Sequence, residues 1–420
     1  MTPSRLRPWL RRALLVACLV AVGLIVGFLG WCQRGLAEAR LLAKHGLWPD
    51  VHASLDRYQW LHPGSAEAHL LAAEALVKDD ALPLERRIGG SLARLRRIPN
   101  SDPLAAEARV AEARVELFLN SSPTAAEKAL RGALERFPDD VAANTLLWKL
   151  LDLTRRSEQA EPYFWKVYDG TPPDQQPLRL RDWYLSQFYP VTSTMELDRM
   201  MGFRISPQDD SSGVESNRLV RFRGSELGSP LCNAAMARWF QSEGELPFAL
   251  ELLDTAAAGL SEEEEADPFF MATLVDVLIE LGEVDRAGEV FDRWTAPAAG
   301  RDYWLARGRV MQESKNDPAE AARSFQEALV DWPGPIDWRS MNRAANCLAR
   351  AGDQEGAKAM RERAAGLELF MDEKLHRRLR AAMGQIDNPE VLQEVVDFYQ
   401  RIDRPREAWG WSEYIRRLRE

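Results

Sequence analysis

The sequence predicts an all-α fold, a solenoid of antiparallel helix pairs preceded by one transmembrane helix. A period of 34 residues separates Ala126 from Ala160 and Ala287 from Ala321, and each alanine is followed four positions later by leucine or phenylalanine. A fixed period of this size is typical of stacked helix pairs. An uncharged apolar stretch over residues 13–32 has the length of a membrane span.

The composition is that of a folded, acidic protein. The 420 residues are 46% hydrophobic and 28% charged, with a net charge of −10. An acidic chain argues against nucleic acid as a partner, because nucleic-acid-binding proteins present basic surfaces. The four cysteines lack the spacing of a disulfide framework or a zinc site, so we expect small buried thiols at Cys18, Cys32, Cys232 and Cys347.

Residues 1–12 form a basic tail, and residues 13–32 are expected to form a signal-anchor helix. At 1.5 Å per residue such a helix is roughly 30 Å long, the thickness of a bilayer core. The arginines of the tail are more concentrated than the charges that follow the stretch, which are Arg34, Glu38 and Arg40. The positive-inside bias therefore predicts a single-pass membrane protein with a cytoplasmic N-terminus and an extracytoplasmic repeat array.

Alternatives stay open at the N-terminus. Ala37-Glu38-Ala39 fits a cleavage site that would release a secreted or periplasmic protein, although signal peptides usually have only about 7–15 apolar residues. Residues 15–18 resemble a lipoprotein processing box, but the apolar run continues beyond Cys18, where such a box should end it. The spacing of Gly23 and Gly27 would let two anchor helices pack closely and self-associate.

The rest of the chain divides into a first array over residues 36–173 and a second over residues 230–420. Residues 174–229 between them are an irregular helical segment and loop, because 205–230 is rich in Ser, Gly and Asp and 217–223 alternates like a short strand. Glycine, proline and capping residues mark where the helices begin and end. The predicted helices are 36–44, 49–61, 65–78, 84–98, 104–119, 124–137, 140–153, 158–168, 178–189, 195–201, 391–401 and 406–418.

The repeat positions alternate small and large side chains. Ala321 and Ala328 allow helices to approach closely, Phe325 and Leu329 fill the gap to the next pair, and Pro333 ends the second helix. A single pair cannot bury its own apolar face, so stacked pairs are needed to form a continuous core.

With Trp304-x3-Gly308 on its preceding helix, this motif resembles the tetratricopeptide repeat (TPR). The match has one extra residue between Gly308 and Ala321. The resemblance covers most of residues 36–420 apart from roughly 174–229, and the repeats at Ala126, Ala160, Ala249, Ala287 and Ala357 match less fully.

The resemblance implies a scaffold that binds a protein or peptide on a concave face lined by the first helices. The polar residues expected to contact a partner there are Arg238, Arg309, Asn342, Asn346 and Arg350. The two asparagines lie one turn apart and suit a peptide backbone, whereas the arginines suit carboxylates. The lysine-and-asparagine clamp that the family uses for a terminal carboxylate is missing except for Asn346, so we expect a groove without a clamp.

Two further groups of residues invite interpretation. Aromatic residues crowd positions 163–189, and we expect at least half of them in the core and the others on a stacking surface beside the loop. The last helix carries Arg406, Arg416, Arg417 and Arg419, which we interpret as the polar outer face of a terminal repeat.

No pattern predicts catalysis, a cofactor or a metal. Four early histidines have irregular spacing, and the acidic run Glu262–Glu265 lacks the alternation of a calcium loop. An enzyme with its site in residues 174–230 is the remaining alternative. That segment contains no histidine or cysteine, which excludes the usual nucleophile–base pairs within it.

Overall fold

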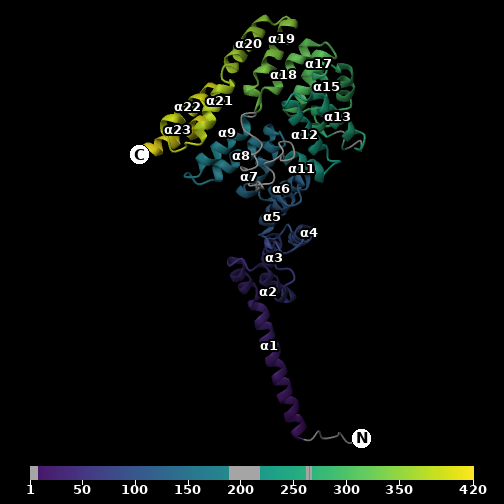
Figure 1. The fold of residues 1–420 in the computed structure, drawn as a ribbon, viewed down its shortest axis with the longest axis vertical. Coiled ribbons are helices and arrows are strands. Elements are labelled where there is room, and N and C mark those ends of the chain that lie inside the picture. Colours follow the sequence, from purple (N-terminus) through teal and green to yellow (C-terminus); the bar gives the residue numbers. More distant parts are fainter. Residues whose placement is uncertain (1–7, 189–217, 262–263, 265–266) are drawn as a thin grey trace. The chain divides into compact units, whose positions relative to one another are not determined.

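The computed structural model describes residues 8–188, 218–261, 264 and 267–420, and within them every regular element is a helix (Figure 1). The all-α prediction is therefore confirmed for the part described. The chain forms two compact units, Met1–Asn120 and Ser121–Glu420. The boundary falls between the predicted helices 104–119 and 124–137, which the sequence assigns to one pair. The predicted array limits follow the repeat pattern instead and stay a prediction.

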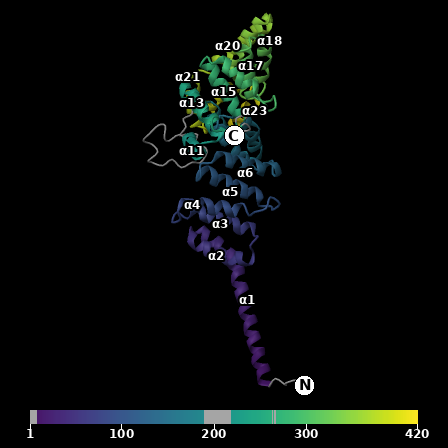
Figure 2. The same cartoon turned by 90° about the vertical axis from the view of Figure 1, so that its right-hand side faces the viewer.

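The first unit contains α1 (Pro8–Lys44), α2 (Trp48–Leu61), α3 (Ala66–Lys78), α4 (Leu84–Leu95) and α5 (Ala105–Phe118). The apolar stretch and the first repeat helix, predicted as separate elements, are one uninterrupted helix, α1 (Figure 2). Gly35 lets α2 approach, since a Cβ there would lie 2.5 Å from the carbonyl oxygen of Ser54. Ala39, Val51 and Leu55 are fully buried in the core that results.

Residues Leu19–Lys44 of α1 are long and apolar enough to cross a membrane, by length and composition. Only 11% of the most apolar window is buried, so this part of α1 does not have the burial of a core helix. A signal sequence near an N-terminus meets the same criterion, and the choice between anchor and signal sequence therefore depends on other contacts.

The second unit contains the remaining helices, which are α6 (Pro123–Arg136), α7 (Val141–Leu153), α8 (Ser157–Gly170), α9 (Gln176–Gln187), α11 (Arg218–Ser225), α12 (Pro230–Ser242), α13 (Leu246–Ala257), α15 (Pro268–Glu280), α16 (Val284–Asp292), α17 (Arg301–Glu313), α18 (Pro318–Ala328), the 3-10 turn η2 (Gly334–Ile336), α19 (Trp338–Arg350), α20 (Gln354–Glu368), α21 (Glu373–Met383), α22 (Pro389–Arg401) and α23 (Pro405–Arg419). Consecutive helices pack as pairs, and first helices also pack on one another, as α12 does on α15 and α15 on α17. In the best repeat the small residue and the large one meet as predicted, because a Cβ on Gly308 would lie 2.8 Å from the ring of Phe325. The expectation that Pro333 ends the second helix is wrong, since α18 already ends at Ala328.

The turns within the pairs share one backbone feature. Each of six turns in the second unit contains a residue with positive φ, namely Arg155, Gly244, Gly282, Asn316, Gly352 and Asp403. A residue in the left-handed conformation lets the following N–H groups bond the unpaired carbonyl oxygens at the end of the first helix, and it reverses the chain within a few residues. The repeated turn makes successive pairs alike despite their different sequences.

The last helices pack back onto the end of the first array and onto the helix that follows it. We call the contacts of α21, α22 and α23 with α8 and α9 the closing interface, visible where the yellow helices meet α8 and α9 (Figure 1). Arg406 bonds Asp169 and stacks on Trp165, and Arg417 donates to the carbonyl oxygen of Pro173. Arg406, Arg416 and Arg419 are exposed, as expected of a polar outer face, but Arg406 and Arg417 also contact the helices on which α23 packs.

The segment between the arrays is described only in part. Residues 218–225 form helix α11, so the strand expected over 217–223 is wrong for its described residues. Leu219 and Phe222 are buried, and their spacing of three residues places both on one face of a helix, whereas a strand would point them to opposite faces. The predicted helix 195–201 and residues 205–217 of the predicted loop lie outside the described residues.

Candidate partner-binding surface

Polar side chains on the first helices of the second array connect one helix pair to the next. The Nε atom of Arg238 donates to Thr273 Oγ1 at 3.0 Å, and Gln241 Nε2 donates to Asp276 Oδ2 at 2.6 Å. Arg309 on the following pair bonds Asp276 from the other side. These partners are 35, 35 and 33 residues apart, so the contacts follow the repeat period. We call them the inter-repeat contacts.

Two predicted partner residues belong to the inter-repeat contacts. Arg238 also pairs with Asp302 at 2.7 Å, and its guanidinium lies 4.4 Å from the ring centroid of Phe269. Arg309 is only 6% exposed and has Asp276 and Glu280 as its acidic neighbours. Both guanidinium groups are therefore engaged within the array, where they align neighbouring first helices.

The other three predicted residues lie along one helix, α19. Asn342 is half-buried, and Asn346 and Arg350 are exposed. Spacing by four residues places them on one side of the helix. Arg350 Nη2 donates to Asn316 Oδ1 at 2.6 Å, whereas the amides of Asn342 and Asn346 have no hydrogen-bond partner among the described residues. The structure thus brings these three together and places Arg238 and Arg309 on other helices.

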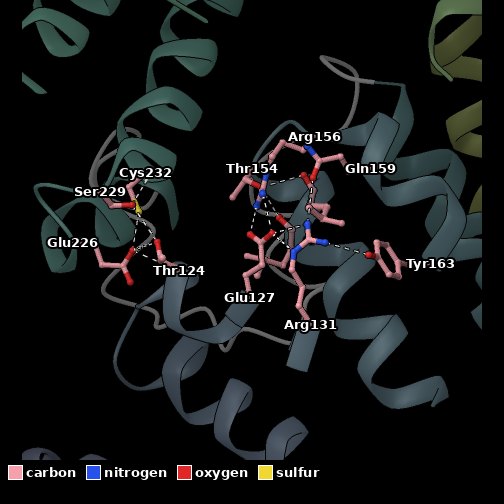
Figure 3. A network of polar contacts seen from close by, with 12 residues as sticks. Thr124, Glu127, Arg131, Thr154, Arg156, Gln159, Tyr163, Glu226, Ser229 and Cys232 are labelled. Carbon is pink, nitrogen blue, oxygen red and sulfur yellow. Dashed lines mark hydrogen bonds and ion pairs between the residues drawn. The ribbon is translucent and has the colours of Figure 1, made fainter. Parts of the chain in front are cut away.

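A second polar region joins α6 and α8 to the start of the second array (Figure 3). The carboxylate of Glu226 accepts hydrogen bonds from Thr124 Oγ1 at 2.6 Å and Cys232 Sγ at 3.3 Å. Burial raises the pKa of the Cys232 thiol, which keeps it protonated and unreactive. Nothing in the sequence indicated this junction, because Glu226 and Thr124 are 102 positions apart.

The neighbouring cluster in Figure 3 is centred on Glu127. Its carboxylate bonds both Nη atoms of Arg156, at 3.0 and 2.6 Å, and Nε of Arg131 at 2.7 Å. Burial alone would raise the pKa of Glu127, but the two arginines outweigh it and lower that pKa. Arg131 also donates to the hydroxyl of Tyr163 at 3.2 Å. The cluster is a satisfied structural network between α6 and α8.

The aromatic stretch serves the closing interface. Trp183 stacks on Phe164 with ring centroids 4.4 Å apart, and its Nε1 atom donates to Glu407 at 3.3 Å. The Tyr184 hydroxyl lies 3.0 Å from His376 Nδ1. The residues of the stretch that are buried are Phe164, Tyr168, Trp183, Tyr184 and Phe188. The expectation that at least half of these aromatic residues lie in the core is thus correct. Trp165 is covered by the guanidinium of Arg406, so it does not offer a free stacking surface. Tyr189 lies outside the described residues.

Burial raises the pKa of four carboxyl groups in the second unit, Asp152, Glu158, Asp267 and Glu407, and in the first two the rise is large. Burial raises the pKa of Asp152 to about 7, although Trp148 and Gln187 donate hydrogen bonds to it at 2.6 and 2.8 Å. Burial, and then the charge of Asp302, raises the pKa of Glu158 to about 7. Both groups lie in contacts between helices, and neither lines either of two surface hollows formed by described residues.

Those hollows have volumes of about 190 and 280 Å³. The first lies between α2, α3 and α4 beside His52 and Arg94, and the second lies beside Phe370 and Arg401. Neither contains any of the five predicted partner residues. Within the part of the chain that the structure describes, no three His, Cys, Asp or Glu side chains gather as a metal site would require.

No protein-family model matches the chain, and no curated protein matches it. Similar solved structures include the APC/C hetero-tetramer Cut9–Hcn1, at 12% identity and a TM-score of 0.36, covering 93% of this chain and 76% of that one. The human IFIT1 dimer with PPP-AAAA is 15% identical with a TM-score of 0.29, covering 79% and 81%. The P58(IPK) TPR domain is 17% identical with a TM-score of 0.28, covering 84% and 98%. These values are too low to carry a conclusion about this chain, so the description of the fold rests on its own helix pairs.

Proposed function

We propose that the protein is a non-enzymatic scaffold, tethered to a membrane by α1, that binds protein or peptide partners along α19 outside the cytoplasm. The observation that carries the proposal is the pair of unbonded amides of Asn342 and Asn346, one turn apart on a first helix. Each amide offers two donors and an acceptor, which match the main chain of an extended peptide.

The neighbouring arginines complete the proposed surface. Arg350 is exposed and offers its guanidinium to a carboxylate of the partner. Arg238 and Arg309 act in the same surface by holding α12, α15 and α17 in line through the inter-repeat contacts. Alignment of the first helices matters because a rigid groove loses little conformational entropy when a partner binds.

The packing of α2 supports an anchor over a cleaved signal peptide. Cleavage after Ala39 would remove Cys32, Gly35 and Leu36, all from the face of α1 that packs on α2. Val51 and Leu55, fully buried in the intact chain, would then lose much of their cover. A stable protein therefore favours retention of α1. The secreted form remains the alternative, and self-association of α1 through Gly23 and Gly27 is a further part of the proposal.

Site-specific crosslinking tests the binding surface. A photoreactive amino acid replaces Asn346 in the full-length protein in cells, and a matched variant carries it at Lys358, an exposed position on the second helix α20. We expect a defined adduct from position 346 that is absent from 358 and is lost with Asn342→Ala. Equal adducts from both positions, or an adduct that is indifferent to Asn342→Ala, would contradict the proposed surface.

Topology is tested separately. A reporter that is active only outside the cytoplasm, fused after Glu420, should be active and should remain with the membrane after alkaline extraction. An inactive but stable fusion would refute the orientation, and an active fusion released into the soluble fraction would favour the secreted alternative.

A further inference from the structure

Three aromatic side chains meet where the apolar part of α1 reaches the first helix pair. Phe28 and Trp31 belong to α1, and their ring centroids are 6.0 Å apart. Trp60 comes from the last turn of α2, and its ring contacts Phe28 edge-on at 5.4 Å. Trp31 is 50% exposed and Trp60 is 68% exposed, so neither ring is there to fill the protein core. We call these three residues the aromatic group.

We propose that the aromatic group docks the base of the α1–α2 pair onto the lipid headgroup region, with Trp60 in contact with the bilayer surface. The proposal rests on the membrane tether put forward above and adds a second point of contact, from outside the apolar stretch. The α1–α2 pair is then held at a set height above the membrane, with no flexible linker between it and the span.

The position of the aromatic group along α1 indicates that lipid is what it contacts. On the N-terminal side the described apolar side chains, from Val16 to Leu29, are exposed at 40–70%, in the manner of a helix with lipid around it. On the other side the amide oxygen Oε1 of Gln33 accepts a hydrogen bond from His62 Nε2 at 2.8 Å, and Arg57 pairs with Glu38 at 2.7 Å. The surface therefore changes from apolar to polar within about one turn of Trp31.

Tryptophan is enriched at this kind of boundary because its large ring is apolar and its N–H group remains polar. Arg57 fits the same boundary, since its guanidinium lies 4.3 Å from the ring centroid of Trp31 and can reach anionic headgroups from there. Contact with lipid would cover the exposed rings of Trp31 and Trp60, which adjoin the proposed membrane span. In water both rings would stay exposed as an apolar patch.

The contact between α1 and α2 makes the docking rigid. Cys32 is 1% exposed, and Gly35 brings the backbone of α1 against Ser54 and Tyr58 of α2. Helix α1 continues without a break from Pro8 to Lys44, so no hinge separates the span from the first pair. The last turn of α2 consequently lies level with residues 28–31 of α1.

Depth-dependent quenching tests the proposal. An environment-sensitive fluorescent amino acid replaces Trp60 in the full-length protein, reconstituted in vesicles of neutral and anionic phospholipid that carry a nitroxide on the headgroup. The matched control carries the same amino acid at Leu41, which is 58% exposed on α1 and lies about 15 Å from Trp31 along that helix, on the side away from the apolar stretch. We expect quenching at position 60 to exceed quenching at position 41 at least about threefold, because only the former lies at the interface.

Flotation of the same samples separates the two hypotheses. If the labelled protein floats with the vesicles but positions 60 and 41 are quenched equally, the tether stands and the docking proposal is wrong. If the protein does not float, the membrane tether itself is wrong, and the docking proposal falls with it. Circular dichroism of each labelled protein establishes that the helices have formed before either result is used.

Discussion

Replacement of Gly282 by alanine tests whether the left-handed turn residues determine the stability of each helix pair. Gly282 has a φ of +83° between α15 and α16, and no atom lies within 4 Å of the position that a Cβ would take. A steric clash therefore contributes nothing, and the whole cost comes from the backbone. An alanine in the left-handed region costs about 1–2 kcal/mol.

Gly132 offers a matched control. It lies inside α6, and an added Cβ would also have no neighbour within 4 Å. Alanine there should stabilise by about 0.5–1 kcal/mol, because glycine is unfavourable in a helix interior. The same chemical change is thus expected to have opposite signs at the two sites.

Hydrogen exchange measures the effect locally, which matters because a repeat array need not unfold in one step. We expect amides of α15 and α16 to exchange roughly 5- to 30-fold faster in Gly282→Ala, the factor that corresponds to 1–2 kcal/mol. Amides of α6 should slow in Gly132→Ala. Unchanged exchange in α15 and α16, or shifts of the same sign in both variants, would refute the reasoning.

Three more outcomes follow from the structure. The pKa of Asp152 is about 7 in the fold, above its unfolded value, so the stability that the protonated carboxyl contributes is full below about pH 4 and is lost as the pH rises through 7. The urea midpoint of Asp152→Asn should therefore rise relative to that of the wild type between pH 5 and pH 8. A difference between the two midpoints that stays constant with pH would contradict this. Trp183→Ala should cost about 3–5 kcal/mol in urea unfolding, whereas Trp409→Ala, at an exposed ring, should change it by less than about 0.5 kcal/mol. Asp140 caps α7 by accepting from the Ala143 N–H at 2.7 Å, so Asp140→Ala should lower the thermal stability by about 1 kcal/mol, and Asp139→Ala, at an exposed neighbour without a cap, serves as the comparison.

The helix pairs were predictable because their determinants are local. Ala321, Phe325 and Gly308 sit at spacings that a sequence shows directly, and the structure packs them as expected. The strand expected over 217–223 is wrong because the apolar side chains that this segment buries are three positions apart, a spacing that suits one face of a helix and not one face of a strand. The continuity of α1 was also missed, since an apolar stretch and an amphipathic helix look like two elements when only composition is compared.

The contacts of single polar side chains are harder to predict, for a physical reason. A first-helix arginine that faces a partner and one that faces the next repeat occupy equivalent positions in the pattern. Arg309 is engaged by Asp276, 33 positions away, and no local spacing distinguishes it from the exposed Arg350. The closing interface escaped prediction altogether, because the residues that meet across it, such as Trp183 and Glu407, are 224 positions apart.

That separation has a consequence during synthesis. Phe164, Trp183 and Tyr184 leave the ribosome long before the helices that cover them. At about 5–20 residues per second, the 224 residues between Trp183 and Glu407 take roughly 10–45 s to make. During this interval the chain presents an uncovered aromatic surface, whereas most repeat contacts form with the neighbour just completed. Native assembly of the second unit therefore finishes only when its last helix arrives, and a chain truncated before α23 keeps a hydrophobic surface that chaperones and proteases recognise.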